Sequence, residues 1–263
     1  MADSALYTEK KARFSRMLTV YGRKPALEAL QDENLRCHAL HLADNNREGG
    51  IVAELTAQAA RRGVAVLHHS RAELARISKN GKQDQGVAVD IACPEFRSLE
   101  DFLPLLEQDR PLRLLALDGI SNPANLGMII RSAAAGCIDG IIWSRRGNAA
   151  LGPLVIKASA GTLYRAPLVI ASELPAALRQ CATRGANICI LDASAPTSLF
   201  DHMPERHCIY VLGNETGGVS AAVRELADTS LSIPMGNSVE SLNVAVTASL
   251  IAYAGLLGTH RAR

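Results

Sequence analysis

The chain has 263 residues, 48% of them hydrophobic, and a formal net charge of only +2. This composition allows a sizeable core and excludes an intrinsically disordered chain, while the small net charge argues against wholesale wrapping of nucleic acid. No apolar run approaches the roughly 20 residues of a membrane-spanning helix, and residues 1–16 lack the apolar segment of a secretory signal. We therefore expect a globular protein of the cytoplasm.

The six cysteines are scattered along the chain, with no C-x-x-C pair. Only Cys37 has a histidine directly beside it, His38. Free cysteine is among the most buried residue types, so we interpret all six as small buried hydrophobic residues. Because the ligand spacings of structural zinc sites are missing, we predict no metal site.

Positive charge is concentrated at the N-terminus. Residues 1–24 have a balance of +4, which leaves −2 for the remainder, and their cations are Lys10, Lys11, Arg13, Arg16, Arg23 and Lys24. A basic arm on a near-neutral body suits contact with a phosphate backbone, so we predict that these six side chains bind nucleic acid. Charge alone also fits a solvated tail, because charged termini are often poorly ordered. We assign the arm to residues 1–17.

Residues 18–93 alternate between helical patterns and short apolar runs. The helical patterns lie at 21–31, 51–62 and 71–78, and the apolar runs lie at 35–42, 64–68 and 86–92. This alternation predicts a small α/β domain. Residues 94–110, between two prolines, are interpreted as a linker with one short helix.

From residue 111 to residue 263 the alternation is clearer. Strands are predicted at 112–118, 140–144, 186–192, 207–213 and 231–235, separated by helices such as 124–136 and 174–185. Continuous apolar strands alternating with helices predict an α/β fold with a mainly parallel sheet covered on both faces. Ligands of such sheets bind beyond the carboxyl ends of the strands. The polar loops 119–125, 213–220 and 234–241 follow strand ends, so we expect them to line one site.

The first loop leads into the helix at 124–136. Ser121 or Asn122 can cap this helix, and Pro123 suits its first turn. Gly127 is unusual inside a helix, where glycine costs about 1 kcal/mol relative to alanine. It shares a helix face with Arg131, so its missing side chain could leave room for a substrate beside the guanidinium. Tight helix packing at Gly127 with a surface Arg131 fits the pattern equally well.

The second loop, "GNETGG" at 213–218, lacks the glycine spacing and the lysine of phosphate-binding loops. Gly213 would let a ligand approach the backbone, and a simple hairpin turn is the alternative. In the third loop we expect Ser241 to cap a final helix whose first turn holds Asn243. That helix is apolar almost all round, which suggests a subunit interface.

Together, the three loops resemble the SpoU (TrmH) family of RNA ribose 2′-O-methyltransferases, within the SPOUT class. "NLGMIIRSA" (125–133), "LGNETGG" (212–218) and "IPMGNSVESLNVAV" (233–246) are similar to its three motifs. "YGRKPALEAL" and "QGVAVDI" are similar to the start and end of the ribosomal-protein-like RNA-binding domain that many members carry. Ala245 and Thr247 stand where members often have Ser and Ala.

The resemblance implies an S-adenosylmethionine-dependent methyltransferase that forms a homodimer and ties its C-terminal part into a trefoil knot. The donor would be held mostly by main-chain contacts, at Leu212, Gly213, Asn214, Gly218, Ile233, Met235, Ser241 and Leu242. Arg131 is the family-matched catalytic residue. Glu215 and Asn243 would orient Arg131, the ribose or the donor, and Asn125 would fix the first loop. The substrate would be structured RNA, with ribosomal RNA favoured over transfer RNA.

Two further hypotheses come from other functional classes. The same fold could serve as an inactive RNA-binding or ribosome-assembly factor, because a fold does not guarantee its chemistry. A doubly wound dehydrogenase would need a glycine fingerprint after an early strand, which "GNETGG" does not supply. The motif residues favour the methyltransferase over both.

Overall fold

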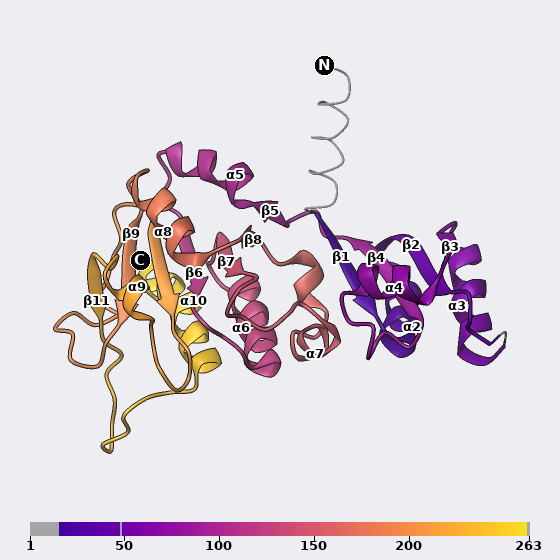
Figure 1. The fold of residues 1–263 in the computed structure, drawn as a ribbon. Helices are drawn as coiled ribbons and strands as arrows, with labels where there is room; N and C mark the ends of the chain where they lie inside the picture. The colour runs from indigo at the N-terminus through magenta and orange to yellow at the C-terminus, as the bar shows by residue number, and fades with distance from the viewer. Residues whose placement is uncertain (1–15, 48, 262–263) are drawn as a thin grey trace. The chain divides into compact units, whose positions relative to one another are not determined.

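The computed structural model describes residues 16–47 and 49–261, with side chains up to residue 254. The chain forms two compact units (Figure 1). The first comprises the chain up to Pro94 together with Leu151–Pro153, and the second comprises Glu95–Ala150 and Leu154–Arg263. Each unit has its own sheet.

The first unit has a four-stranded sheet in the order β1-β4-β2-β3, in which only β2 and β3 run parallel. Its elements are β1 (Met17–Tyr21), α2 (Arg23–Gln31), β2 (Arg36–Ala43), α3 (Gly50–Arg61), β3 (Ala65–His69), α4 (Arg71–Ser78) and β4 (Val87–Ala92). Sequence patterns predict all of these except β1, a short strand whose Leu18 and Val20 alternate inward. A capping box between Ser70 and Glu73 starts α4.

The second unit has seven strands, all parallel, in the order β11-β9-β10-β6-β7-β8-β5. They are β5 (Arg97–Ser98), β6 (Arg113–Leu117), β7 (Gly140–Ser144), β8 (Leu168–Ala171), β9 (Asn187–Leu191), β10 (Cys208–Leu212) and β11 (Thr229–Leu231). The α/β class and the mainly parallel sheet are thus confirmed. Strands β5 and β8 were missed. The last strand ends at Leu231, the first residue of its predicted range, and Pro234, which cannot donate to a strand ladder, lies three residues beyond.

Helices cover both faces of this sheet. They are α5 (Leu99–Phe102), α6 (Pro123–Ala135), α7 (Pro153–Ala158), α8 (Leu174–Ala182), α9 (Ala221–Arg224) and α10 (Val244–Arg261), with 3-10 helices η1 (Leu103–Glu107) and η2 (Thr162–Arg165). On one face α5, η1, α8 and α9 pack against strand residues such as Ile188, Ile209 and Val211. No helix in the described part of the chain is long and apolar enough to cross a membrane.

Helices α6 and α10 lie together, and glycine permits their close approach. A Cβ atom on Gly136, the C-cap of α6, would lie 2.8 Å from both Cβ and the carbonyl oxygen of Ala252 in α10. The hydroxyl of Ser249 donates to Ser132 across the same contact, at 2.8 Å. The carboxyl end of α6 is therefore fixed against the final helix.

Candidate active site

A cavity of about 480 Å³ lies at the carboxyl ends of β9 and β10, the position at which parallel sheets bind ligands. Its walls come from the ends of the two strands, from residues 213–219 and from residues 233–244. All eight side chains or backbone segments predicted to hold the donor line it: Leu212, Gly213, Asn214, Gly218, Ile233, Met235, Ser241 and Leu242. The structure therefore brings the second and third motifs to one volume, which lies within the range of small-molecule sites.

The loop after β10 is a tight hairpin that closes on its own first residue. Asn214 and Gly218 exchange two backbone hydrogen bonds, of 2.9 and 2.8 Å. A Cβ atom on Gly213 would lie 2.3 Å from the carbonyl carbon of Gly218 and from the nitrogen of Val219. Glycine is required here by the loop's own backbone. The backbone of Gly213 also lines the cavity, so the approach of a ligand to it stays a prediction.

Asn214 organises this loop. Its side-chain amide donates to the carbonyl of Gly119 at 2.8 Å, and its side-chain oxygen accepts from the backbone nitrogens of Thr216 and Gly217. The backbone nitrogen of Ser220 also donates to Asp118 at 2.7 Å. These bonds tie the loop after β10 to the loop after β6, as the sequence predicts for adjacent strand ends.

Three motif side chains form a polar chain beside the cavity. Asn125 is buried in the first turn of α6; its amide nitrogen donates to Glu215, and its oxygen accepts from the amide of Asn243 at 3.2 Å. Asn125 of the first motif thus joins Glu215 of the second motif to Asn243 of the third. Asn243 also caps α10, because its side-chain oxygen accepts from the nitrogen of Ala245 at 2.8 Å. The prediction that Ser241 caps this helix is wrong.

Arg131 stands apart from this chain. It is exposed on α6, does not line the cavity, and makes no hydrogen bond or ion pair with the side chains described, those of residues 16–47 and 49–254. Glu215 and Asn243 each bond Asn125 and neither bonds Arg131 within this chain, which leaves the ribose or the donor as the groups that they are predicted to orient. At Gly127 the tight-packing alternative holds, because a Cβ atom there would lie 2.5 Å from that of Ala158. Helix α6 is capped by Asn122 rather than by Ser121, because the side-chain oxygen of Asn122 accepts from the nitrogens of Ala124 and Asn125.

Sequence reasoning missed three charged residues of the cavity wall: Asp192, Arg224 and Glu240. Asp192 directly follows β9. Its position at the carboxyl end of a parallel strand is the signal that could have identified it. Its carboxylate lies 3.5 Å from the guanidinium of Arg224. Hydrogen bonds from Ser194 hold the pKa of Asp192 below its usual value. With Glu215 and Glu240 also in the wall, the cavity suits a cationic ligand.

Comparison with known proteins assigns the fold and its chemistry. Residues 113–253, more than half of the chain, match the family model described as the SpoU rRNA Methylase family. The chain belongs to the SpoU methylase family. Residues 19–97 match a second model, described as RNA 2′-O ribose methyltransferase substrate binding. As a SpoU methylase, the protein is an S-adenosylmethionine-dependent RNA methyltransferase.

Relatives of this SpoU methylase include uncharacterized tRNA/rRNA methyltransferases of Mycobacterium avium (strain 104), 35% identical, and Mycobacterium tuberculosis (strain ATCC 25618 / H37Rv), 34% identical. Both alignments span 233 residues and 89% of this chain, with 75% and 72% of the respective relative. The SpoU methyltransferase AviRb from Streptomyces viridochromogenes, solved in complex with AdoMet, shares the fold with a TM-score of 0.63 at 21% identity, covering 94% of this chain and 92% of AviRb. A TrmH-family protein from Porphyromonas gingivalis matches with a TM-score of 0.58 at 25% identity, over 90% of this chain and 88% of that one.

The predicted RNA-binding cations of this SpoU methylase have different surroundings. Lys10, Lys11 and Arg13 lie outside the described residues. Arg16 and Lys24 are exposed, whereas Arg23 is held by its own unit: its side chain donates to the carbonyl of Gln85 and to Asn46, each at 3.2 Å. Arg23 therefore has a structural task in addition to any contact with RNA.

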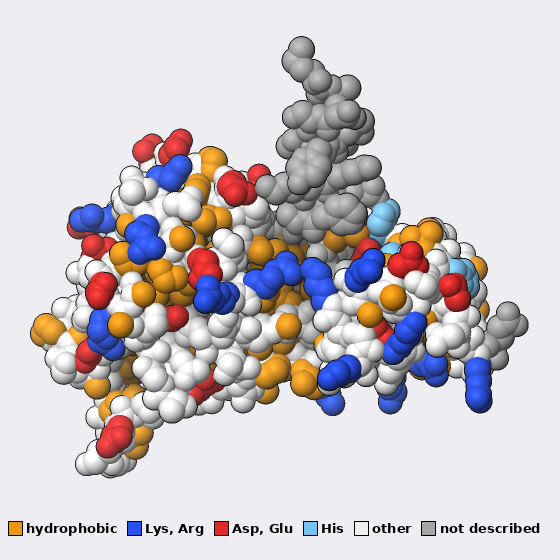
Figure 2. Space-filling view, viewed as in Figure 1, with side chains coloured by type: hydrophobic (Ala, Val, Ile, Leu, Met, Phe, Trp, Pro, Cys, Tyr) orange, Lys and Arg blue, Asp and Glu red, His pale blue; other side chains and the backbone are white. Residues whose placement is uncertain are grey.

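Lys and Arg side chains are frequent on the first unit in the face shown in Figure 2. Among the described residues of this unit, the exposed cations are Arg16, Lys24, Arg36, Arg47, Arg61, Arg71, Arg76, Lys79 and Lys82, and the exposed anions are Glu28, Glu33, Asp44, Glu54 and Glu73. Cations therefore prevail well beyond the N-terminal arm. A surface of this kind attracts a phosphate backbone.

Proposed function

We propose that this SpoU methylase transfers its methyl group to a ribose 2′-hydroxyl of structured RNA, with ribosomal RNA favoured over transfer RNA. The observation that carries the proposal is the chain of hydrogen bonds from Glu215 through Asn125 to Asn243, at the rim of the cavity. These groups offer an acceptor and amide donors to a sugar hydroxyl. The match of residues 19–97 to a 2′-O ribose methyltransferase substrate-binding model supports the same choice.

The cavity fits S-adenosylmethionine by its shape and by its charge. Leu212, Ile233 and Leu242 provide apolar walls, and the loop backbone near Gly213 provides main-chain polar groups. The donor carries a positive sulfonium, which suits a wall with Asp192 and Glu240 and no lysine. When bound there, the donor supplies an electrophilic methyl group. We propose the eight motif residues of the wall as its contacts.

The protein's own contribution to the transfer is mainly positioning and charge stabilisation, because a ribose hydroxyl is far too weak an acid to ionise at neutral pH. Glu215, fixed by Asn125, would accept the hydrogen bond of the hydroxyl and orient its oxygen. Arg131 would hold the adjacent phosphate and stabilise the developing alkoxide, since a guanidinium donates hydrogen bonds, stays positively charged and accepts no proton.

Arg131 requires a second copy of the chain in this scheme. It lies one helical turn from Met128, which is 41% exposed on α6, and Val246 and Tyr253 of the adjoining α10 are 47% and 42% exposed. We propose that this apolar surface forms the homodimer interface and that Arg131 serves the cavity of the partner. A two-fold interface of this kind would supply both cavities equally.

We propose three further features in line with the family resemblance. The C-terminal part that contains the two cavity loops would form a trefoil knot. The first unit, at 18–93, would be the RNA-binding domain, preceded by the basic arm (1–17). Residues 94–110, predicted as a linker to the catalytic domain (111–263), instead supply β5, α5 and η1 to the second unit. The described cysteines are all free thiols, which suits the reducing cytoplasm.

Transfer of a labelled methyl group from the donor to RNA, followed by digestion to nucleosides, tests the function. We expect the label in 2′-O-methylnucleosides over many turnovers. Label on a base would refute the proposed acceptor, and the absence of label from ribosomal and transfer RNA alike would favour an inactive RNA-binding or assembly factor. Mapping of methylated sites in total RNA, with and without the gene, would then identify the RNA.

A mixed dimer tests the role of Arg131. One subunit would carry Arg131→Ala and the other Gly213→Ala, so that one donor cavity stays intact and faces the remaining Arg131. We expect each parent dimer to lose about 100-fold or more of its transfer rate, and the mixed dimer to regain about half of the wild-type rate because one of two equivalent sites is whole. A mixed dimer as inactive as its parents would show that Arg131 does not act across the interface. Near-normal turnover of the Arg131→Ala dimer would remove Arg131 from the mechanism.

A further inference from the structure

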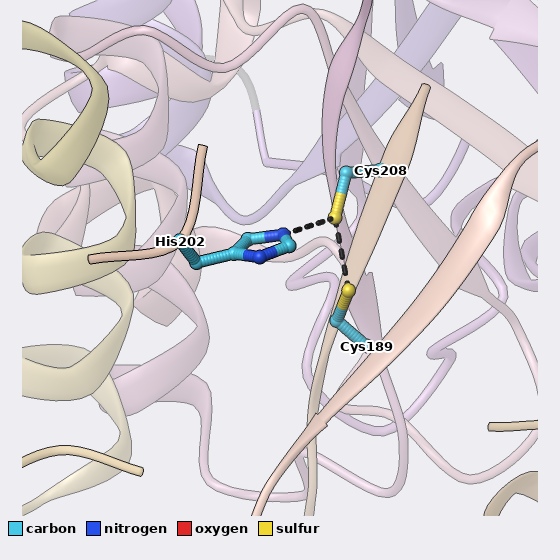
Figure 3. Close-up of side chains that lie close together, drawn as sticks. All are labelled: Cys189, His202 and Cys208. Carbon is cyan, nitrogen blue, oxygen red and sulfur yellow. Dashed lines mark hydrogen bonds between the residues drawn. The ribbon is translucent and has the colours of Figure 1, made fainter. Parts of the chain in front are cut away.

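Two cysteines and one histidine, distant in sequence, meet in the second unit (Figure 3). The sulfur of Cys189 in β9 lies 3.0 Å from the sulfur of Cys208, the first residue of β10. The Nε2 atom of His202, from the segment that joins these strands, lies 3.7 Å from the sulfur of Cys208. All three ligand atoms fall within 4.8 Å of one another.

This cluster is separate from the donor cavity. None of Cys189, His202 and Cys208 lines the cavity; Cys208 begins β10, and the cavity-lining residues of that strand, Val211 and Leu212, lie at its other end. A strand advances about 3.3 Å per residue, so the two ends of β10 are roughly 13 Å apart. The cluster therefore lies toward the amino end of the sheet, where it touches none of the proposed donor contacts.

A buried hydroxyl group lies beside the cluster. Tyr210 is 1% exposed, and its ring lies edge-on to that of His202 with centroids 6.1 Å apart. The hydroxyl oxygen of Tyr210 has no nitrogen or oxygen partner among the described residues, and its polar neighbour is the sulfur of Cys208. Sulfur is a weak hydrogen-bond partner, whereas native structures usually satisfy buried hydroxyl groups fully. Tyr210 therefore indicates room for a further polar ligand beside the cluster.

We propose that Cys189, Cys208 and His202 bind a zinc-class metal ion, with a water hydrogen-bonded to Tyr210 in the fourth position. Two thiolates and one imidazole form a soft donor set that selects Zn²⁺ over Mg²⁺ or Ca²⁺. With metal–sulfur bonds of about 2.3 Å, tetrahedral geometry separates two sulfurs by roughly 3.8 Å. The sulfurs would move apart by less than about 1 Å, which small side-chain rotations allow.

A disulfide between the same cysteines fits the strand register less well. Cys208 lies opposite Asn187, and Cys189 lies opposite Tyr210, so the two cysteines are diagonal neighbours on adjacent parallel strands. Strands about 4.8 Å apart and a two-residue offset of about 6.6 Å place the two Cα atoms roughly 8 Å apart. Disulfides rarely bridge more than about 7 Å. A metal ion links the two sulfurs through two metal–sulfur bonds instead of one sulfur–sulfur bond, so it can span this distance.

A metal here would have a structural role with an effect on the donor cavity. It would tie His202 to β9 and β10 and thereby fix the segment 192–207. That segment begins with Asp192 and Ala193, which line the donor cavity. The three ligands show no metal-binding motif in the sequence because two strands and their connection, rather than one short loop, bring them together.

The test uses the untagged, full-length protein, reduced and freed of metal with a chelator. Titration with Co²⁺ should produce thiolate-to-cobalt charge transfer and the ligand-field bands of tetrahedral coordination, and Zn²⁺ should abolish both. After desalting, elemental analysis should find one zinc per chain. Cys189→Ser, Cys208→Ser and His202→Ala should each weaken zinc binding by more than about 10-fold, the lower limit for the loss of an outer partner of a metal ligand.

Matched controls keep the result interpretable. Cys137→Ser makes the same chemical change at a half-buried free thiol elsewhere in the unit and should leave zinc binding unchanged. Tyr210→Phe removes only the hydroxyl and should weaken zinc binding by about 10-fold with circular dichroism unchanged. The proposal is overturned if wild type shows no charge-transfer band, if the band persists in Cys189→Ser and Cys208→Ser, or if a Cys189–Cys208 disulfide is recovered from protein prepared with zinc.

Discussion

The donor cavity of the second unit and the surface of the first unit differ in charge. The cavity wall contains Asp192, Glu215 and Glu240, and its arginine, Arg224, is already beside Asp192. On the described surface of the first unit, exposed lysines and arginines outnumber exposed acids. A net charge of +2 for the whole chain hides this division. It follows that the two proposed ligands, a sulfonium donor and an RNA polyanion, would be attracted by separate regions of opposite charge.

The largest effect is expected from Gly213→Ala, which should remove donor binding without weakening the attraction of the first unit for RNA. Its Cβ atom would overlap the backbone of Gly218 and Val219, so the hairpin must move. We expect donor affinity, measured by calorimetry, to fall more than about 100-fold, or about 3 kcal/mol. Gly217→Ala is the matched control, because its Cβ atom meets nothing within 4 Å. Equal affinities for the two variants would contradict the assigned hairpin geometry.

Asn125→Ala should separate catalysis from donor binding at the cavity. Asn125 joins Glu215 to Asn243 but does not line the cavity. We expect the transfer rate at saturating donor and RNA to fall about 100-fold, with donor affinity changed by less than about threefold. Asn125→Asp, which keeps the side-chain volume but loses the amide donor, should behave similarly. Thr216→Ala, in the exposed loop that carries Glu215, should leave both the transfer rate and the donor affinity at wild-type values.

Removal of exposed cations from the first unit should weaken RNA binding. Lys24 and Lys82 are exposed, and their side chains make no hydrogen bond or ion pair within the described residues. Replacing both with Ala should weaken RNA binding by about 10-fold and reduce the slope of log affinity against log salt by about 1 for each phosphate that is no longer neutralised. Donor affinity should not change. The matched double change Arg179→Ala and Arg206→Ala, in the second unit, should have a smaller effect; an equal effect would place RNA on both units alike.

The smallest effect concerns the stability of the first unit. Burial alone would raise the pKa of Asp90, but hydrogen bonds with His41 and Thr19 outweigh burial and hold that pKa below its usual value. Asp90 therefore stabilises the folded state above its ordinary pKa of about 3.9, and this contribution is lost as the pH falls through the lower folded value. Asp90→Asn should lower the free energy of unfolding, measured with urea, by about 1 kcal/mol at pH 7 and by less in acid. The figure is discounted because the Asp90 side chain is partly exposed. Asp44→Asn, at an exposed position, should cost nothing measurable.

Sequence patterns predicted the parts of the fold that depend on local periodicity. Long apolar runs such as those of β6, β7, β9 and β10 match their strands closely. Strands β5 and β8, with two and four residues, are too short to show a period. Strand β1 has five residues but no continuous apolar run. The helix cap was misassigned because Ser241 and Asn243 are equally good capping residues, and only the backbone decides where α10 begins.

The candidate site was predicted where side chains follow strand ends, and missed where tertiary contacts decide. The motifs located the cavity wall, but Gly127 and Gly213 both serve close packing within the protein. The link from Asn125 to Glu215 spans 90 residues, so no local pattern could show it. The cluster of Cys189, His202 and Cys208 escaped for the same reason, since the sheet brings β9 and β10 together.

The division of charge between the two regions is tested most directly by one salt titration of the wild-type, full-length protein. RNA affinity and donor affinity would be measured on the same sample between low and physiological ionic strength. We predict that RNA affinity falls steeply, with a log–log slope that reflects several released counterions, while donor affinity stays nearly constant. An RNA affinity that does not respond to salt, or two slopes that fall in parallel, would contradict the assignment of RNA to the basic unit and of the donor to the acidic cavity.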